Sequence, residues 1–161
     1  MTRLRIEARG LLGAIALLSL GALSAAMATQ IFWGMQPCPW CVLQRLIFLV
    51  IGVLAIVGRW LPVPALRLGA APLALLLAVA GMSAALWQQL VASKTASCDL
   101  TLADRIIEAT TLDRLWPTVF SATANCAEAS VPLLGLPYAL WSLAAFALVA
   151  GLSLRALRRR R

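Results

Sequence analysis

The chain is built around the stretch Pro37-Cys38-Pro39-Trp40-Cys41-Val42-Leu43-Gln44-Arg45. Its two cysteines have the C-x-x-C spacing of a redox dithiol, and a long apolar run begins directly after them, at Val42. This order of residues predicts a cysteine pair at the point where a helix enters a membrane. Arg45 then lies just inside, and the rest of the chain is expected to hold the pair at the membrane surface and supply it with electrons.

Composition separates this chain from soluble proteins. Of its 161 residues, 62% are hydrophobic and 12% are charged, whereas soluble domains have about a quarter charged residues. Most of the apolar residues lie in four blocks, and each block is close to the length of helix that crosses a bilayer. We therefore expect an all-α membrane protein, a four-transmembrane-helix bundle forming a single integral membrane domain over residues 1–161. The expected helices cover about 11–32, 42–57, 72–91 and 137–154.

Basic residues predict how the bundle is oriented. They gather at the termini and after the second block, at Arg3, Arg5, Arg9, Arg59, Arg67, Arg155 and Arg158 to Arg161, whereas the loop 92–136 carries Lys94, Arg105 and Arg114. The positive-inside bias then puts both termini in the cytoplasm and the loops 33–41 and 92–136 on the outer, periplasmic face. Topology accounts for the net charge of +8, so nucleic acid is not an expected partner.

The first apolar block has a second interpretation. Its basic start and the sequence Ala26-Met27-Ala28 resemble a cleaved signal peptide. The apolar run is longer than the usual signal-peptide core of about 7–15 residues, which favours a retained helix. Small residues at Gly21, Ala25 and Thr29 then form a stripe suited to close helix packing in lipid.

The loop 92–136 is the one long polar segment. Thr101 to Trp116 reads as an amphipathic helix, because apolar residues such as Ala103 and Ile107 alternate with acidic ones at helical spacing. Thr101 and Asp104 have the spacing of a capping box. The helix either lies on the membrane surface or is an ordinary surface helix of the loop.

The four cysteines, Cys38, Cys41, Cys98 and Cys126, favour redox chemistry over metal binding. Structural zinc needs four ligands, usually two close pairs or histidines, and here the second pair is widely spaced and histidine is absent. No metal site is therefore expected. A thiolate at a helix N-terminus is stabilised by unpaired backbone N–H groups and the helix dipole, which is where the C-x-x-C lies.

Arg45 lies one turn after Cys41 on the same helix face. It is suited to stabilise a thiolate or to donate to an oxygen of a bound acceptor, although an arginine can also reach the surface merely to be hydrated. Cys98 and Cys126 form either a structural staple or an exchange site for a soluble partner. In the second case two dithiol pairs make a relay. Without haem, iron–sulfur or flavin motifs, a lipid-soluble quinone is the simplest two-electron acceptor.

The residues resemble the DsbB family of bacterial membrane disulfide-bond formation proteins. The likeness covers the four apolar blocks, Cys-Pro-Trp-Cys followed by Gln44-Arg45, and the cysteine pair of the long loop. It continues in three later stretches, Trp116-Pro117-Thr118-Val119-Phe120, Asn125-Cys126-Ala127-Glu128 and Leu134-Gly135-Leu136-Pro137.

This resemblance implies a role for each cysteine. A reduced periplasmic DsbA-type oxidoreductase attacks Cys98, the freed Cys126 exchanges with Cys38, and Cys41 is released as a thiolate facing ubiquinone or menaquinone. Arg45 polarises the quinone carbonyl and holds the thiolate. The implied location is the bacterial inner membrane, with electrons passing to its quinone pool.

The chain departs from the family pattern at one position, and three other functions are considered. Some family members have a histidine near the quinone at the outer end of the third helix, where this chain offers only Trp87, Gln88 or Gln89. The chain could be a specialised paralogue with a dedicated substrate, or a membrane scaffold with structural disulfides. A vitamin K epoxide reductase-like enzyme is disfavoured, because in that family the loop cysteines precede the C-x-x-C.

Overall fold

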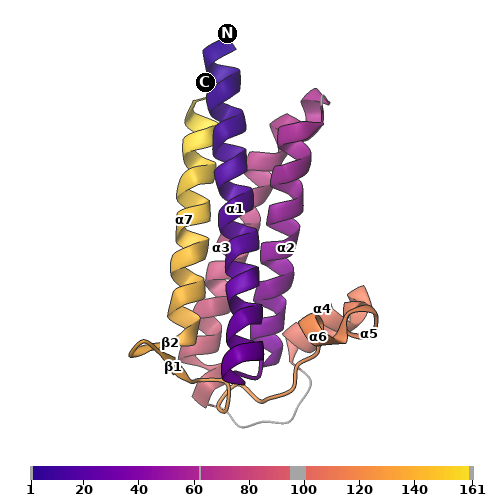
Figure 1. Cartoon of the computed structure of the whole chain (residues 1–161), viewed down its shortest axis with the longest axis vertical. Helices are drawn as coiled ribbons and strands as arrows, with labels where there is room; N and C mark the ends of the chain where they lie inside the picture. Colours follow the sequence, from indigo (N-terminus) through magenta and orange to yellow (C-terminus); the bar gives the residue numbers. More distant parts are fainter. Residues whose placement is uncertain (1, 62, 95–100, 160–161) are drawn as a thin grey trace.

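Four long helices run side by side and make up most of the molecule (Figure 1). The computed structural model describes residues 2–61, 63–94 and 101–159. All four helices are long and apolar enough to cross a membrane, which confirms the expected all-α architecture. Their bounds are α1 (Thr2–Trp33), α2 (Pro39–Trp60), α3 (Pro64–Leu90) and α7 (Tyr138–Arg158).

Helix α3 starts earlier than the apolar block that predicts it. Pro64 occupies its first turn, where a missing N–H costs nothing, and Pro72 lies inside the helix. The extra turns are held by packing on α2. Gly58 leaves room for them, because a Cβ added there would lie 2.6 Å from the Cβ of Ala70. Close contact with α2 thus extends the helix beyond the strongly apolar residues.

The bundle core contains a pair of stacked aromatic rings. Phe48 of α2 and Phe146 of α7 lie parallel, with ring centroids 3.9 Å apart. Gly81 of α3 faces this stack, and a Cβ added there would overlap the ring of Phe146. Phe146 is fully buried, so it has little freedom to move aside. Three helices therefore meet at one tightly packed layer.

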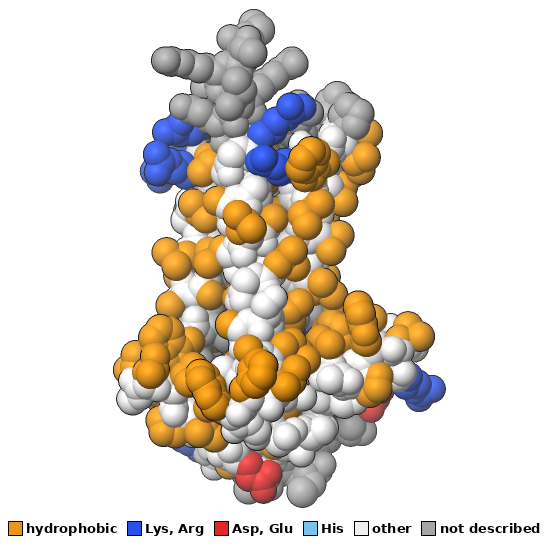
Figure 2. All heavy atoms as spheres, viewed as in Figure 1, with side chains coloured by type: hydrophobic (Ala, Val, Ile, Leu, Met, Phe, Trp, Pro, Cys, Tyr) orange, Lys and Arg blue, Asp and Glu red, His pale blue; other side chains and the backbone are white. Residues whose placement is uncertain are grey.

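The outside of the bundle is apolar, and its two ends differ (Figure 2). Large side chains such as Leu17, Leu76 and Leu148 are mostly exposed, which suits contact with lipid. Lys and Arg side chains gather at the end where both termini lie. Arg59, at that end, donates from Nη1 to the carbonyl of Arg9 at 2.6 Å, which joins α2 to α1.

At the other end, the long loop folds into short helices. They are the 3-10 turn η1 (Ala92–Lys94), α4 (Leu102–Thr110), α5 (Leu112–Leu115) and α6 (Pro117–Phe120). Thr101 and Asp104 form the expected capping box at the start of α4. The helix expected from Thr101 to Trp116 is interrupted, because Thr111 has a left-handed backbone with φ of 56°. Buried Ala103 and Ile107 face the bundle core.

A two-residue hairpin leads into α7. Strands β1 (Pro132–Leu133) and β2 (Leu136–Pro137) pair antiparallel. The turn residues Leu134 and Gly135 both have positive φ, as a type I′ hairpin turn requires. The Trp141 indole N–H donates to the carbonyl of Leu133 at 3.1 Å. The hairpin is thereby fastened to the first turn of α7.

The packing around Gly81 predicts opposite effects for two glycine substitutions. Gly81→Ala drives a methyl group into the buried Phe146 ring and should lower the unfolding free energy by about 1–3 kcal/mol. Gly151→Ala in α7 meets no atom within 4 Å and should leave stability unchanged or slightly raised. Unfolding in detergent followed by circular dichroism measures both. Equal midpoints for the two variants would contradict the described packing.

Candidate functional site

The two cysteines of the C-x-x-C lie at the start of α2. Cys38 is the N-cap residue, and its sulfur accepts from the backbone N–H of Cys41 at 3.4 Å. The two sulfurs are 3.0 Å apart as thiols, so a small approach brings them to bonding distance. Cys38 has no exposed surface, whereas Cys41 is half-buried. The expected position at a helix entrance is confirmed.

Backbone contacts bring the end of the long loop to this pair. The N–H groups of Thr123 and Ala124 both donate to the carbonyl of Pro37, at 3.0 and 3.3 Å. The Thr123 hydroxyl also donates to Gln36 Oε1 at 2.6 Å. Because Pro37 precedes Cys38 directly, these bonds fix the loop beside the start of α2.

Cys126 is seated against Cys38 by a compact turn. Asn125 and Glu128 exchange side-chain to backbone hydrogen bonds, at 2.9 and 3.3 Å. The turn buries Cys126, which packs in one cluster with Cys38, Ala92 and Ala129. Cys98 lies outside the described residues. The structure therefore packs Cys38 against Cys126, one cysteine of the loop pair.

The pKa values of the Cys38 and Cys126 thiols are shifted in opposite directions. The hydrogen bond between the two side chains, followed by that to Cys41 and by burial, raises the pKa of Cys38 far above its ordinary value. The same bond from Cys38 lowers the pKa of Cys126. In the dithiol state Cys38 therefore keeps its proton, and Cys126 is the more readily ionised partner.

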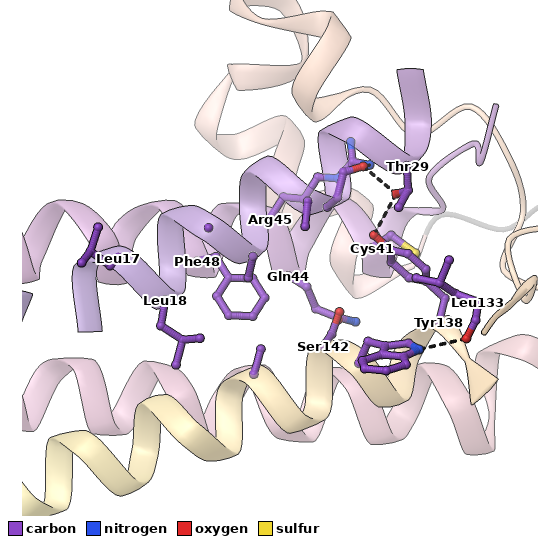
Figure 3. A pocket seen from close by; sticks show the side chains of 16 residues that line it. Leu17, Leu18, Thr29, Cys41, Gln44, Arg45, Phe48, Leu133, Tyr138 and Ser142 are labelled. Atoms are coloured by element: carbon purple, nitrogen blue, oxygen red, sulfur yellow. Dashed lines mark hydrogen bonds between the residues drawn. The ribbon is translucent and has the colours of Figure 1, made fainter. Parts of the chain in front are cut away.

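On the other side of the C-x-x-C lies a cavity of about 390 Å³ between α1, α2 and α7. Figure 3 shows Cys41, Gln44, Arg45 and Phe48 of α2 along it. Most of its remaining wall is apolar. That wall includes Leu17, Leu18, Ala22, Ala25, Leu133, Trp141 and Ala145. The described residues contain no cluster of His, Cys, Asp or Glu that could hold a metal ion, whereas the cavity suits a lipophilic molecule.

The small-residue stripe of α1 was expected to pack closely against another helix, but it lines the cavity. Gly21, Ala25 and Thr29 line the cavity, and a Cβ added at Gly21 would meet nothing within 4 Å. Small side chains here leave space between helices. Thr29 and Tyr138 close the loop end of the space, with their hydroxyl oxygens 3.1 Å apart (Figure 3).

Arg45 is buried and tied to two other elements. Its Nη1 donates to Gln30 Oε1 at 2.6 Å and to the carbonyl of Val119 in α6 at 3.1 Å. Its Nη2 donates to the carbonyl of Ala26 at 3.3 Å. The side chain is therefore held inside by α1 and α6 and does not reach out to water. Nothing in the sequence pointed to Gln30 or to a loop carbonyl as its partners.

At the outer end of α3, Gln88 contacts Cys41 and is itself bonded to Gln44 of α2. Gln88 Nε2 of α3 donates to Cys41 Sγ at 3.0 Å, and Gln44 Nε2 donates to Gln88 Oε1 at 2.6 Å. Of the three residues considered from the sequence, Gln88 is the one that reaches the cysteine. Trp87 instead lies near Trp40, with ring centroids 6.3 Å apart.

Comparison with known proteins agrees with this arrangement. Residues 8–156 match the family described as Disulfide bond formation protein DsbB. Disulfide bond formation protein B 1 of Pseudomonas putida is 33% identical over 150 residues, covering 92% of this chain and 89% of that protein. Disulfide bond formation protein B of Dechloromonas aromatica is 33% identical over 149 residues, covering 89% and 88%. A C-x-x-C at a membrane-helix entrance, a loop cysteine packed against it and this match together identify the chain as a member of the DsbB family, a multi-pass membrane thiol oxidoreductase of disulfide-bond formation.

Proposed function

We propose that this protein reoxidises a periplasmic DsbA-type dithiol oxidase and passes the electrons to membrane quinone, either ubiquinone or menaquinone. One observation carries the proposal. The C-x-x-C stands between two different environments, with Cys38 packed against Cys126 of the loop and Cys41 facing an apolar cavity among membrane helices. Such a pair can take electrons from the loop side and release them on the cavity side.

In the proposed relay each thiol–disulfide exchange forms one S–S bond and breaks another. A thiolate of the reduced partner attacks Cys98 in a Cys98–Cys126 disulfide, and Cys126 leaves as a thiolate. Cys126 then attacks Cys38, the Cys38–Cys41 bond breaks, and the electron pair stays on Cys41. The contact between Cys126 and Cys38 supports this order, since an attacking sulfur must reach the sulfur that it attacks. The partner's second thiolate completes its own disulfide by displacing Cys98 as a thiolate. Cys98 then attacks Cys126 and releases Cys38, and the Cys38 and Cys41 dithiol gives two electrons and two protons to the quinone, which restores both disulfides.

The cavity residues fit a quinone. Bound there, a quinone supplies an acceptor for two electrons and two protons. Arg45 lines the cavity, and its Nε–H and one N–H of Nη2 are not used in its contacts with Gln30, Val119 and Ala26. These donors can hold a carbonyl oxygen next to Cys41, and the apolar walls exclude water from the reacting sulfur.

The proposed orientation has both termini in the cytoplasm and the cysteines on the periplasmic face of the inner membrane. The gathering of Lys and Arg at the end of the bundle with the termini supports it (Figure 2). Thiols at the opposite end then lie where disulfides persist.

The relay predicts that quinone consumption depends on both cysteine pairs. Purified protein in detergent is given a reduced thioredoxin-like periplasmic partner and a soluble quinone analogue, and quinone absorbance is followed. Wild type should consume quinone in step with partner thiols. Cys41→Ser and Cys98→Ser should each abolish turnover, because each removes one member of a required disulfide. Turnover that survives in either variant would rule out the relay.

Substitution of Arg45 should act mainly on the quinone. Arg45→Met removes the charged donors at the cavity wall and should raise the apparent KM for quinone about tenfold or more, with a smaller change in the KM for the partner. Arg59→Met is the matched control, because Arg59 contacts the carbonyl of Arg9 at the other end of the bundle. An unchanged quinone KM in folded Arg45→Met would exclude this role.

Reporter fusions test the orientation. Green fluorescent protein fused after Arg161 should fluoresce, and alkaline phosphatase at the same site should be inactive, because that enzyme needs an oxidising compartment for its disulfides. Alkaline phosphatase fused after Lys94, at the loop end, should be active. The reverse pattern would show that the protein is inserted the other way.

A further inference from the structure

Two buried glutamines connect α2 and α3 beside Cys41. Gln44 and Gln88 are each only 3% exposed, and both lie within helices long and apolar enough to span a membrane. An amide in such surroundings is costly unless it is hydrogen-bonded. The Gln44–Gln88 bond meets part of this need. The chain of contacts does not stop there, since Gln88 also reaches the sulfur of Cys41.

The bond to Gln44 fixes which end of Gln88 faces the sulfur. Gln44 donates from Nε2, so Gln88 must present Oε1 to it at 2.6 Å. The Nε2 amide group of Gln88 is then directed at Cys41 Sγ, 3.0 Å away. An N–H donor stabilises a sulfur most when that sulfur carries negative charge. The pair of glutamines is therefore arranged for a thiolate at Cys41.

We infer that Gln88 is the hydrogen-bond donor that makes Cys41 the leaving sulfur when the Cys38–Cys41 disulfide opens, and that Gln44 positions it. This inference rests on the proposed function and adds to it the residue that sets the direction of exchange. In the step concerned, Cys126 thiolate forms a bond to Cys38 Sγ and the Cys38–Cys41 bond breaks. The electron pair moves to Cys41 Sγ, and the Gln88 N–H donates a hydrogen bond to the newly charged sulfur.

The alternative role is purely structural, as a polar link between two membrane helices. The two roles differ in what they require of Gln88. A structural link needs only an acceptor for Gln44, and a carboxylate supplies one equally well. Stabilisation of a thiolate requires the N–H. Gln88→Glu separates the roles when its carboxyl is ionised, because it then keeps the size and the acceptor but has no hydrogen to donate to Cys41.

The test measures exchange directly, without quinone. In a Cys98→Ser background the free Cys126 competes with Cys41 for Cys38, so the protein distributes between Cys38–Cys126 and Cys38–Cys41 disulfides. Acid quenching, alkylation of the free thiol and mass spectrometry of peptides give the ratio of the two. Gln88→Met should lower the Cys38–Cys126 share relative to Cys38–Cys41 by about tenfold or more, the effect of one hydrogen bond to a charged atom.

Three further variants sharpen the result. Gln88→Glu, with exchange carried out at a pH high enough to ionise its carboxyl, should lower the ratio at least as much as Gln88→Met. Gln44→Met should lower it less, because Gln88 loses only its orientation. Gln89→Met, at the next position of α3, has no part in this chain of contacts and should match the parent. If Gln88→Glu does not fold, Gln88→Met and Gln44→Met decide the question.

Two outcomes would overturn the inference. If the parent forms Cys38–Cys126 and Gln88→Met leaves the ratio unchanged or raised, Gln88 does not set the leaving sulfur, although the relay stands. If the parent forms no Cys38–Cys126 disulfide at all, the exchange step of the relay is wrong and the inference fails with it. Quinone consumption by wild type, measured separately, still reports on the proposed acceptor.

Discussion

The burial of Cys38 is the constraint on which the rest of the site depends. This residue caps α2, contacts Cys41 within its own helix and packs under Cys126 from the loop, with no exposed surface. A sulfur enclosed in this way can be reached by the neighbouring cysteines but not readily by other thiols. The loop is held in place by backbone bonds to Pro37, so the contact does not rely on the sulfurs alone.

Arg45 imposes a second constraint, because a guanidinium inside an apolar helix is costly unless most of its donors have partners. Gln30 and Ala26 of α1 and the carbonyl of Val119 in α6 accept from three of these donors. The same bonds hold α1, α2 and the loop together around the cavity. Functional geometry and stability therefore share one set of contacts, and small residues of α1 leave the space beside them.

Several features could be predicted from the sequence because they depend on local pattern. Hydropathy predicted the four helices, and the C-x-x-C before Val42 predicted thiols at the entrance of α2. The capping box at Thr101 and Asp104 was also predictable, since capping needs only residues three positions apart. The early start of α3 and the break at Thr111 were not, because packing on α2 and a left-handed backbone at a non-glycine residue leave no clear sequence signal.

The fold class, the family likeness and the residue types available for redox chemistry follow from the sequence alone. Tertiary packing was needed to show that Cys126 contacts Cys38, that Gln88 rather than Trp87 reaches Cys41, and that the carbonyl of Val119 accepts from Arg45. The reason is physical. Helix formation and membrane insertion follow from neighbouring side chains, whereas these contacts join segments far apart in the chain, and a backbone carbonyl is the same at every residue.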